Sequence, residues 1–151
     1  MDLLKAIQDS GLGVWIRESS WALFAALIVH TISMGFVVGT GLAIDARLLG
    51  VARGVPLAAL RRLLAVAGWA LPFVVLSGLV LVIGYPAKAL TNPLFYAKLA
   101  ALAVALALTW RMVREPPSWA RLGALLSMPL WVLGVAGGRF LAYTHKILLV
   151  Y

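Results

Sequence analysis

The segment between Trp21 and Asp45 limits what this chain can fold into more than any other stretch. Its 23 residues include one side chain that titrates near neutral pH, His30. At the rise of about 1.5 Å per residue of an α-helix, they span roughly 35 Å, enough to cross the hydrocarbon core of a bilayer. An imidazole inside such a segment is costly, so His30 is the first candidate for a functional residue.

The remainder of the chain is also strongly apolar. Hydrophobic residues make up 64% of its 151 residues, whereas soluble domains are about half apolar. The apolar runs are continuous and lack the alternating pattern of a membrane β-barrel. Helices and closed barrels are the structures that satisfy backbone polar groups in lipid. The predicted fold is therefore an all-α integral membrane four-helix bundle, with residues 1–151 forming a single membrane domain.

The hydropathy pattern predicts spans at about 21–44, 63–83, 93–113 and 119–143. Residues 1–12 are predicted to form a short interfacial helix that Gly11 and Gly13 stop, and residues 144–151 a tail. Pro72 and Pro129 are expected to kink the second and fourth spans. The first ten residues have no apolar core of the signal-peptide kind, so the first span is expected to direct insertion.

The formal net charge of +8 favours a membrane surface as the partner and argues against nucleic acid, because the basic residues lie between apolar spans. No basic run is longer than Arg61-Arg62. The first and third loops carry seven basic residues, and the termini and second loop carry six. The compact cluster in the first loop favours a bacterial inner (cytoplasmic) membrane protein with both termini in the periplasm.

His30 has three open interpretations. On an ideal helix it shares a face with Ala26, Ser33 and Gly41, small residues that leave room for a neighbouring helix or a flat ligand. It is therefore a candidate ligand of a cofactor, with haem b favoured, or an interhelical hydrogen-bond partner of a Ser or Thr, or a proton-transfer group. Met34 lies one turn further on, so a copper site shared with His30 also stays open.

His145 is the weaker candidate for a second axial ligand of the metal. The first and fourth spans are antiparallel, so the start of one and the end of the other lie on the same side of the membrane. The two depths match poorly in the sequence, since His30 lies about 13 Å past Trp21 and His145 lies near the surface. A five-coordinate haem or a Met ligand is the alternative.

Three basic residues are expected on the same side of the membrane as His30: Arg17, Lys98 and Arg139. They are candidates for binding the propionates of a haem, which are anionic and need cationic partners when half buried. The alternative is that their side chains extend to lipid phosphates.

Catalytic chemistry has little support in the sequence. The acids lie outside the spans or at their ends, with Asp45 and Arg47 predicted to mark the exit of the first span; they are Asp2, Asp9, Glu18, Asp45 and Glu115. The lack of a buried carboxylate pair argues against a transporter built on acidic relays. The chain has no cysteine, which excludes disulfides, zinc-thiolate sites and iron–sulfur clusters.

Four sequence features together resemble an uncharacterised bacterial family of four-helix membrane proteins. They are W-I-R-E-S-S-W (Trp15 to Trp21), His30 itself, D-A-R-L-L-G (Asp45 to Gly50) and N-P-L-F-Y-A-K (Asn92 to Lys98). The resemblance covers roughly residues 13–113 and implies a fold but no function. Its members often have an acidic residue two before the histidine, where this chain has Ile28. The chain is more loosely similar to membrane b-type cytochromes and copper-resistance membrane proteins.

The functional expectation is a membrane b-type cytochrome-like electron-transfer subunit that binds haem through His30. It would pass electrons between the quinone pool, or a periplasmic partner, and another protein. The alternative is a cofactor-free accessory subunit whose glycine faces pack against a larger membrane complex or a second copy of the chain. A small transporter or channel is a third interpretation.

Overall fold

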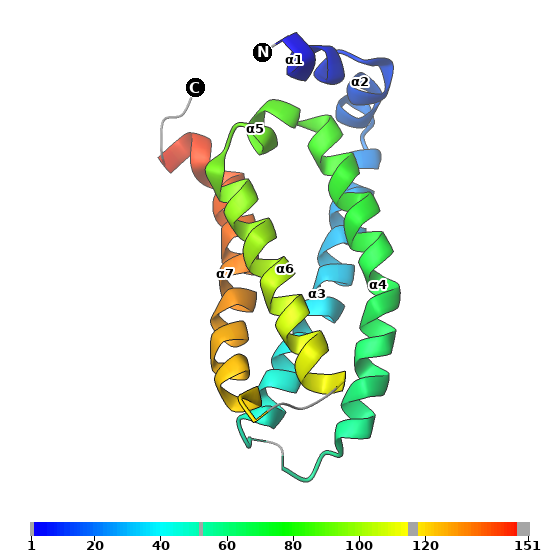
Figure 1. Ribbon diagram of the computed structural model, residues 1–151. Coiled ribbons are helices and arrows are strands. Elements are labelled where there is room, and N and C mark those ends of the chain that lie inside the picture. Colours follow the sequence, from blue (N-terminus) through cyan, green and yellow to red (C-terminus); the bar gives the residue numbers. More distant parts are fainter. Residues whose placement is uncertain (1, 52, 115–117, 148–151) are drawn as a thin grey trace.

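The computed structural model describes the chain except for residues 1, 52, 115–117 and 148–151. Within the described ranges the chain is helical and contains no strand, which confirms the expected all-α fold (Figure 1). The helices are α1 (Asp2–Gln8), α2 (Gly11–Glu18), α3 (Ala22–Leu48), α4 (Leu57–Gly84), α5 (Pro86–Leu90), α6 (Pro93–Arg114) and α7 (Ala120–Ile147).

The four long helices α3, α4, α6 and α7 are each long and apolar enough to cross a membrane, with mean hydropathies between 1.5 and 2.4. Their outward faces expose large apolar side chains, including Phe24, Trp69 and Leu126. A water-soluble protein rarely exposes apolar patches of this extent. The protein is therefore a multi-pass membrane protein whose outward side chains face lipid.

The helices extend beyond several of the predicted spans. α3 continues four residues past position 44, and α4 begins at Leu57 so that Arg61 and Arg62 lie in its first turns. α7 reaches Ile147, so the first part of the expected tail is helical, while residues 148–151 lie outside the described residues. Hydropathy marks the hydrocarbon core, whereas a hydrogen-bonded helix continues into the headgroup region.

The predicted short amino-terminal helix is confirmed, but its expected bounds of 1–12 need correction. The structure has two short helices there, and Gly11 begins the second instead of ending the first. The cause is Ser10, whose hydroxyl accepts a hydrogen bond from the Gly13 N–H at 3.1 Å and caps α2. Helix α5 was also not predicted; Pro86 occupies its first turn, where a missing N–H costs nothing.

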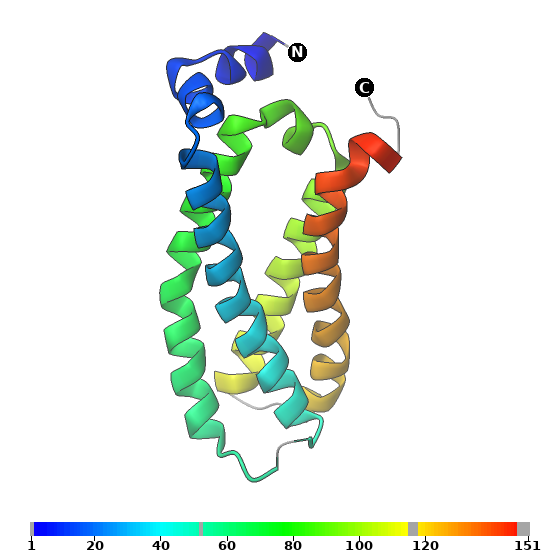
Figure 2. The same ribbon diagram turned by 180° about the vertical axis from the view of Figure 1, so that it is seen from behind.

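The long helices form two antiparallel pairs, α3 with α4 and α6 with α7 (Figures 1 and 2). The pairs lie together at the end that carries the α3–α4 and α6–α7 loops and diverge toward the end that carries the termini. The three buried apolar clusters lie from the middle of the bundle to the loop end; they centre on Val37 with Trp131, on Ile44 with Leu64, and on Met112 with Ala124.

The two pairs are joined mainly where α3 crosses α7. The indole of Trp131 is 1% exposed and lies directly on Gly41, and a Cβ atom at position 41 would overlap its ring. Helices in lipid gain little from the hydrophobic effect between them, so their association depends on close packing of this kind.

We predict that Gly41→Ala destabilises the bundle by about 1–3 kcal/mol, because the added methyl group overpacks a fully buried ring. The matched control is Gly39→Ala on the same helix, where an added Cβ has no atom within 4 Å. Unfolding of both variants in mixed detergent micelles measures the difference. Equal stabilities would contradict the proposed role of the Gly41–Trp131 contact.

Candidate cofactor site around His30

His30 lies half buried on α3 and is held by α4. Its Nδ1 atom is 3.1 Å from the carbonyl oxygen of Val74 and 3.1 Å from the hydroxyl oxygen of Ser77. Gly78 allows this approach, because a Cβ there would lie 3.3 Å from the imidazole Cε1. The interpretation of His30 as an interhelical hydrogen-bond partner of a serine is confirmed.

These contacts indicate which ring nitrogen carries the proton. A carbonyl oxygen can only accept, so we infer that Nδ1 is protonated and donates to Val74. The Ser77 hydroxyl gives its own proton to the carbonyl of Phe73 and is free to accept from the ring as well. In the neutral imidazole, Nε2 then keeps its lone pair, and it has no hydrogen-bond partner among the described residues. Histidines that ligate metals are commonly oriented by this second hydrogen bond to a carbonyl.

Lys98 on α6 is a cation whose charge acts on this imidazole. Its charge lies close enough to His30 for a direct electrostatic interaction. The side chain is half buried, with Nζ 5.1 Å from the centre of the Phe95 ring and Cβ against Gly137 of α7. His30 is thus held by α4 of one helix pair, and Lys98 lies at the contact between the two helices of the other pair.

The other two basic candidates are placed elsewhere. Arg17 donates to the carbonyl of Gln8 at 2.6 Å and to that of Gly84 at 3.3 Å, so its guanidinium joins α2 to the end of α4. Arg139 is exposed on α7. No described contact joins either of them to His30.

The backbone of His145 lies in the last turns of α7, and its side chain falls outside the described residues. Trp131 of α7 packs on Gly41 of α3, and the two helices are antiparallel. His30 is eleven residues before Gly41, so the position on α7 at the same depth is eleven residues after Trp131, at Ala142. Position 145 is three residues further, about 4.5 Å along the axis. The helix register brings the two positions nearer in depth than the sequence alone indicated.

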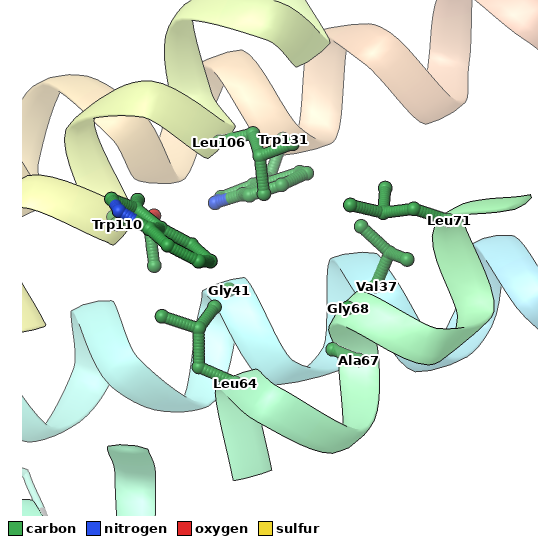
Figure 3. Close-up of a pocket in the computed structure, with 10 residues that line it drawn as sticks. Val37, Gly41, Leu64, Ala67, Gly68, Leu71, Leu106, Trp110 and Trp131 are labelled. Carbon is green, nitrogen blue, oxygen red and sulfur yellow. The ribbon is translucent and has the colours of Figure 1, made fainter. Parts of the chain in front are cut away.

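A small cavity lies elsewhere in the bundle, away from His30. It has a volume of about 40 Å³ and is lined by Gly41, Leu64, Thr109, Trp110, Trp131 and other apolar residues (Figure 3). Pockets for organic cofactors are typically 300–1,000 Å³, so this one takes water at most. A flat cofactor at His30 would have to lie between the diverging helix pairs. Among the described residues, no group of three His, Cys, Asp or Glu side chains could hold a metal by itself.

The structure corrects the interpretation of Asp45 as a marker of the first span's exit. The residue lies inside α3, is 0% exposed, and neither of its carboxylate oxygens has a hydrogen-bond partner among the described residues. Its spacing of four from Gly41 and eight from Val37, both buried, places it on the inward face of α3. This spacing can be read from the sequence and indicates a buried position, whereas the charge of Asp45 favoured the end of the span.

The comparisons with known proteins give no independent information about this site. No family profile, curated protein or solved structure matches the chain.

We predict that His30 is the Nδ1-protonated tautomer when the ring is neutral, since the Val74 carbonyl can only accept. The ¹⁵N NMR spectrum of a His145→Gln variant, in which His30 is the single histidine, measures this directly. Ser77→Ala should leave the tautomer unchanged, because the bond to Val74 remains. A proton found on Nε2 would show that the contact with α4 is not the one described.

Proposed function

We propose that the protein is a b-type cytochrome-like electron-transfer subunit that binds haem b through Nε2 of His30. The observation that carries the proposal is the hydrogen bond from Nδ1 to the Val74 carbonyl, which leaves the outer nitrogen with an unshared lone pair. An imidazole oriented by a backbone carbonyl is a common axial ligand arrangement.

The residues around His30 fit such a group in two further respects. Lys98 supplies a half-buried positive charge near the imidazole, which suits an anionic propionate. Gly138 on α7 is half buried, and a Cβ atom added there would have no atom within 4 Å, so this face of α7 has unfilled space beside it. His145 is the candidate for the second ligand, because the helix register brings positions 30 and 145 to similar depths.

A bound haem would supply one-electron redox chemistry. The chain's own residues would determine how it does so. The Val74 carbonyl orients the imidazole and increases its basicity, and the charge of Lys98 offsets that of a propionate. The surrounding apolar helices limit the access of water to the site. Each of these effects acts on the reduction potential.

The cellular setting is part of the same proposal. The distribution of basic residues supports a bacterial inner membrane location with both termini in the periplasm. α1 lies at the end of the bundle where α3 begins (Figure 2), and His30 is eight residues past the start of α3, so the cofactor would lie toward the periplasmic side. Electrons would then pass between the quinone pool, or a periplasmic protein, and another membrane subunit.

We predict that the full chain, purified in detergent after expression with sufficient haem, gives a reduced-minus-oxidised spectrum with a Soret shift and a sharp α-band. His30→Ala should lose this spectrum, with bound haem falling by more than the roughly 10–100-fold affinity loss seen when an outer-shell partner is removed. Added imidazole should restore part of it, because the free ligand can fill the vacated position.

The control is Thr31→Ala, which changes an exposed neighbour on the same helix and should bind haem normally. If His145 is the second ligand, His145→Ala should retain haem and change its spin state. A wild-type protein that is stable and colourless would remove the cytochrome proposal.

One observation favours the alternative of a cofactor-free accessory subunit. Gly35 and Gly39 are exposed on α3 with no atom near an added Cβ, and a shallow groove lies between Ile32, Gly35 and Phe36. A GxxxG surface of this kind suits close approach of another membrane helix. Because the chain has no cysteine, a Cys introduced at position 35 would report such a neighbour by cross-linking.

A further inference from the structure

A second polar site lies at the opposite end of the bundle, around Asp45. This residue is in the last turns of α3 and is completely buried, and both of its carboxylate oxygens lack a hydrogen-bond partner among the described residues. It plays no part in the proposed haem site, since His30 is fifteen residues away on the same helix, about 22 Å along its axis.

Other unpartnered polar atoms surround the same region. They are the hydroxyl oxygens of Thr109 on α6 and Ser127 on α7 and the indole Nε1 of Trp131, all buried. Trp131 packs on Gly41, and one turn further along each antiparallel helix Ser127 comes level with Asp45. The Ser127 hydroxyl faces the carboxylate without forming a hydrogen bond of good geometry.

Thr109 lies at the same level. Met112 of α6 lies against Gly123 of α7, and Leu102 lies against Gly134, which gives the register of this antiparallel pair. In that register Thr109 falls beside Ser127. Three helices thus bring one carboxyl group and two hydroxyl groups to one depth of the bundle, and none of these groups forms a hydrogen bond of good geometry within the described part of the chain.

The basic residues at this end are engaged elsewhere. Arg47 donates to the carbonyl of Val55 at 2.6 Å, and Arg61 donates to the last carbonyls of α6, at Val113 and Arg114. Arg111 and Arg114 lie over the rings of Trp119 and Trp110. Arg53 lies beside Gly50, and Arg62 and Arg121 are exposed. No described cation forms an ion pair with Asp45, and an ionised carboxylate buried in this way is strongly disfavoured.

A proton is the cation that suits this site. Metal ions such as Na⁺ or Mg²⁺ need several oxygen ligands around a defined space, and among the described residues no group of three His, Cys, Asp or Glu side chains could hold one. The nearby cavity is lined by Thr109 and Trp131 and not by Asp45. A proton needs no such space, and the Ser127 and Thr109 hydroxyls can each accept a hydrogen bond from the protonated carboxyl group or donate one to it.

The nearby cavity can hold water close to this group of polar side chains. Its volume of about 40 Å³ exceeds the space that one water molecule needs, and two of its lining residues, Thr109 and Trp131, carry unpartnered polar atoms that water would satisfy. In Figure 3 the indoles of Trp110 and Trp131 flank this space opposite Gly41 and Leu64. We propose that Asp45 is an intramembrane proton-binding site that exchanges its proton with water entering this cavity, which residues of α3, α4, α6 and α7 line.

The test is infrared difference spectroscopy of the full chain in lipid nanodiscs, titrated from alkaline to acid pH. Subtracting the spectrum of Asp45→Asn from that of the wild type should leave one carboxyl C=O band that appears as the pH falls. The matched control is Glu18→Gln, which removes an exposed acid and should leave the Asp45 band in place.

Two further variants keep Asp45 and test its surroundings, so the result does not depend on Asp45→Asn folding. Ser127→Ala and Thr109→Val should each move the band to higher frequency, because a hydrogen bond to the carbonyl lowers its stretching frequency. No Asp45 band at any pH, or an unmoved band in both variants, would overturn the proposal. A band that disappears when Na⁺ replaces choline at constant pH would assign the site to a metal cation instead.

Discussion

The packing of Trp131 on Gly41 is the contact on which the arrangement of this bundle depends. Each helix pair is a hairpin that its own short loop can hold together, whereas the two hairpins meet mainly where α3 crosses α7. Only a glycine lets the backbone of α3 come this close to a fully buried indole. On the loop side of this crossing the helices enclose Asp45, and on the other side they diverge around His30.

The two polar centres of the bundle differ in how their polar groups are satisfied. His30 has a carbonyl and a hydroxyl as partners and keeps one nitrogen free at a half-buried position. Asp45 is 0% exposed, and its carboxylate oxygens accept no hydrogen bond of good geometry from the residues that the structure describes. The first arrangement suits a ligand that approaches from the space between the hairpins. The second suits a small species that can reach a closed interior, because lipid offers no substitute for the missing hydrogen bonds.

Much of the fold could be predicted from the sequence, because the spans are set by length and hydropathy, and both are local properties. His30 could be identified as a functional candidate because a single histidine within an apolar segment is also a local property of the sequence. The partners of His30 were not predictable, since Val74 and Ser77 meet it through a helix register that hydropathy does not encode. Asp45 was assigned to the surface because a charge usually ends a span, and its burial depends on α6 and α7 covering it.

The hydrogen bonds of Arg17 have a consequence for how the protein is made. This side chain holds the amino-terminal helices to the carbonyl of Gly84, at the end of a helix that is synthesised 67 residues later. Until α4 has crossed the bilayer, the acceptor is absent and the first eighteen residues have nothing to dock against at that point. Helices α1 and α2 can therefore take up this docked position only after α4 has been inserted.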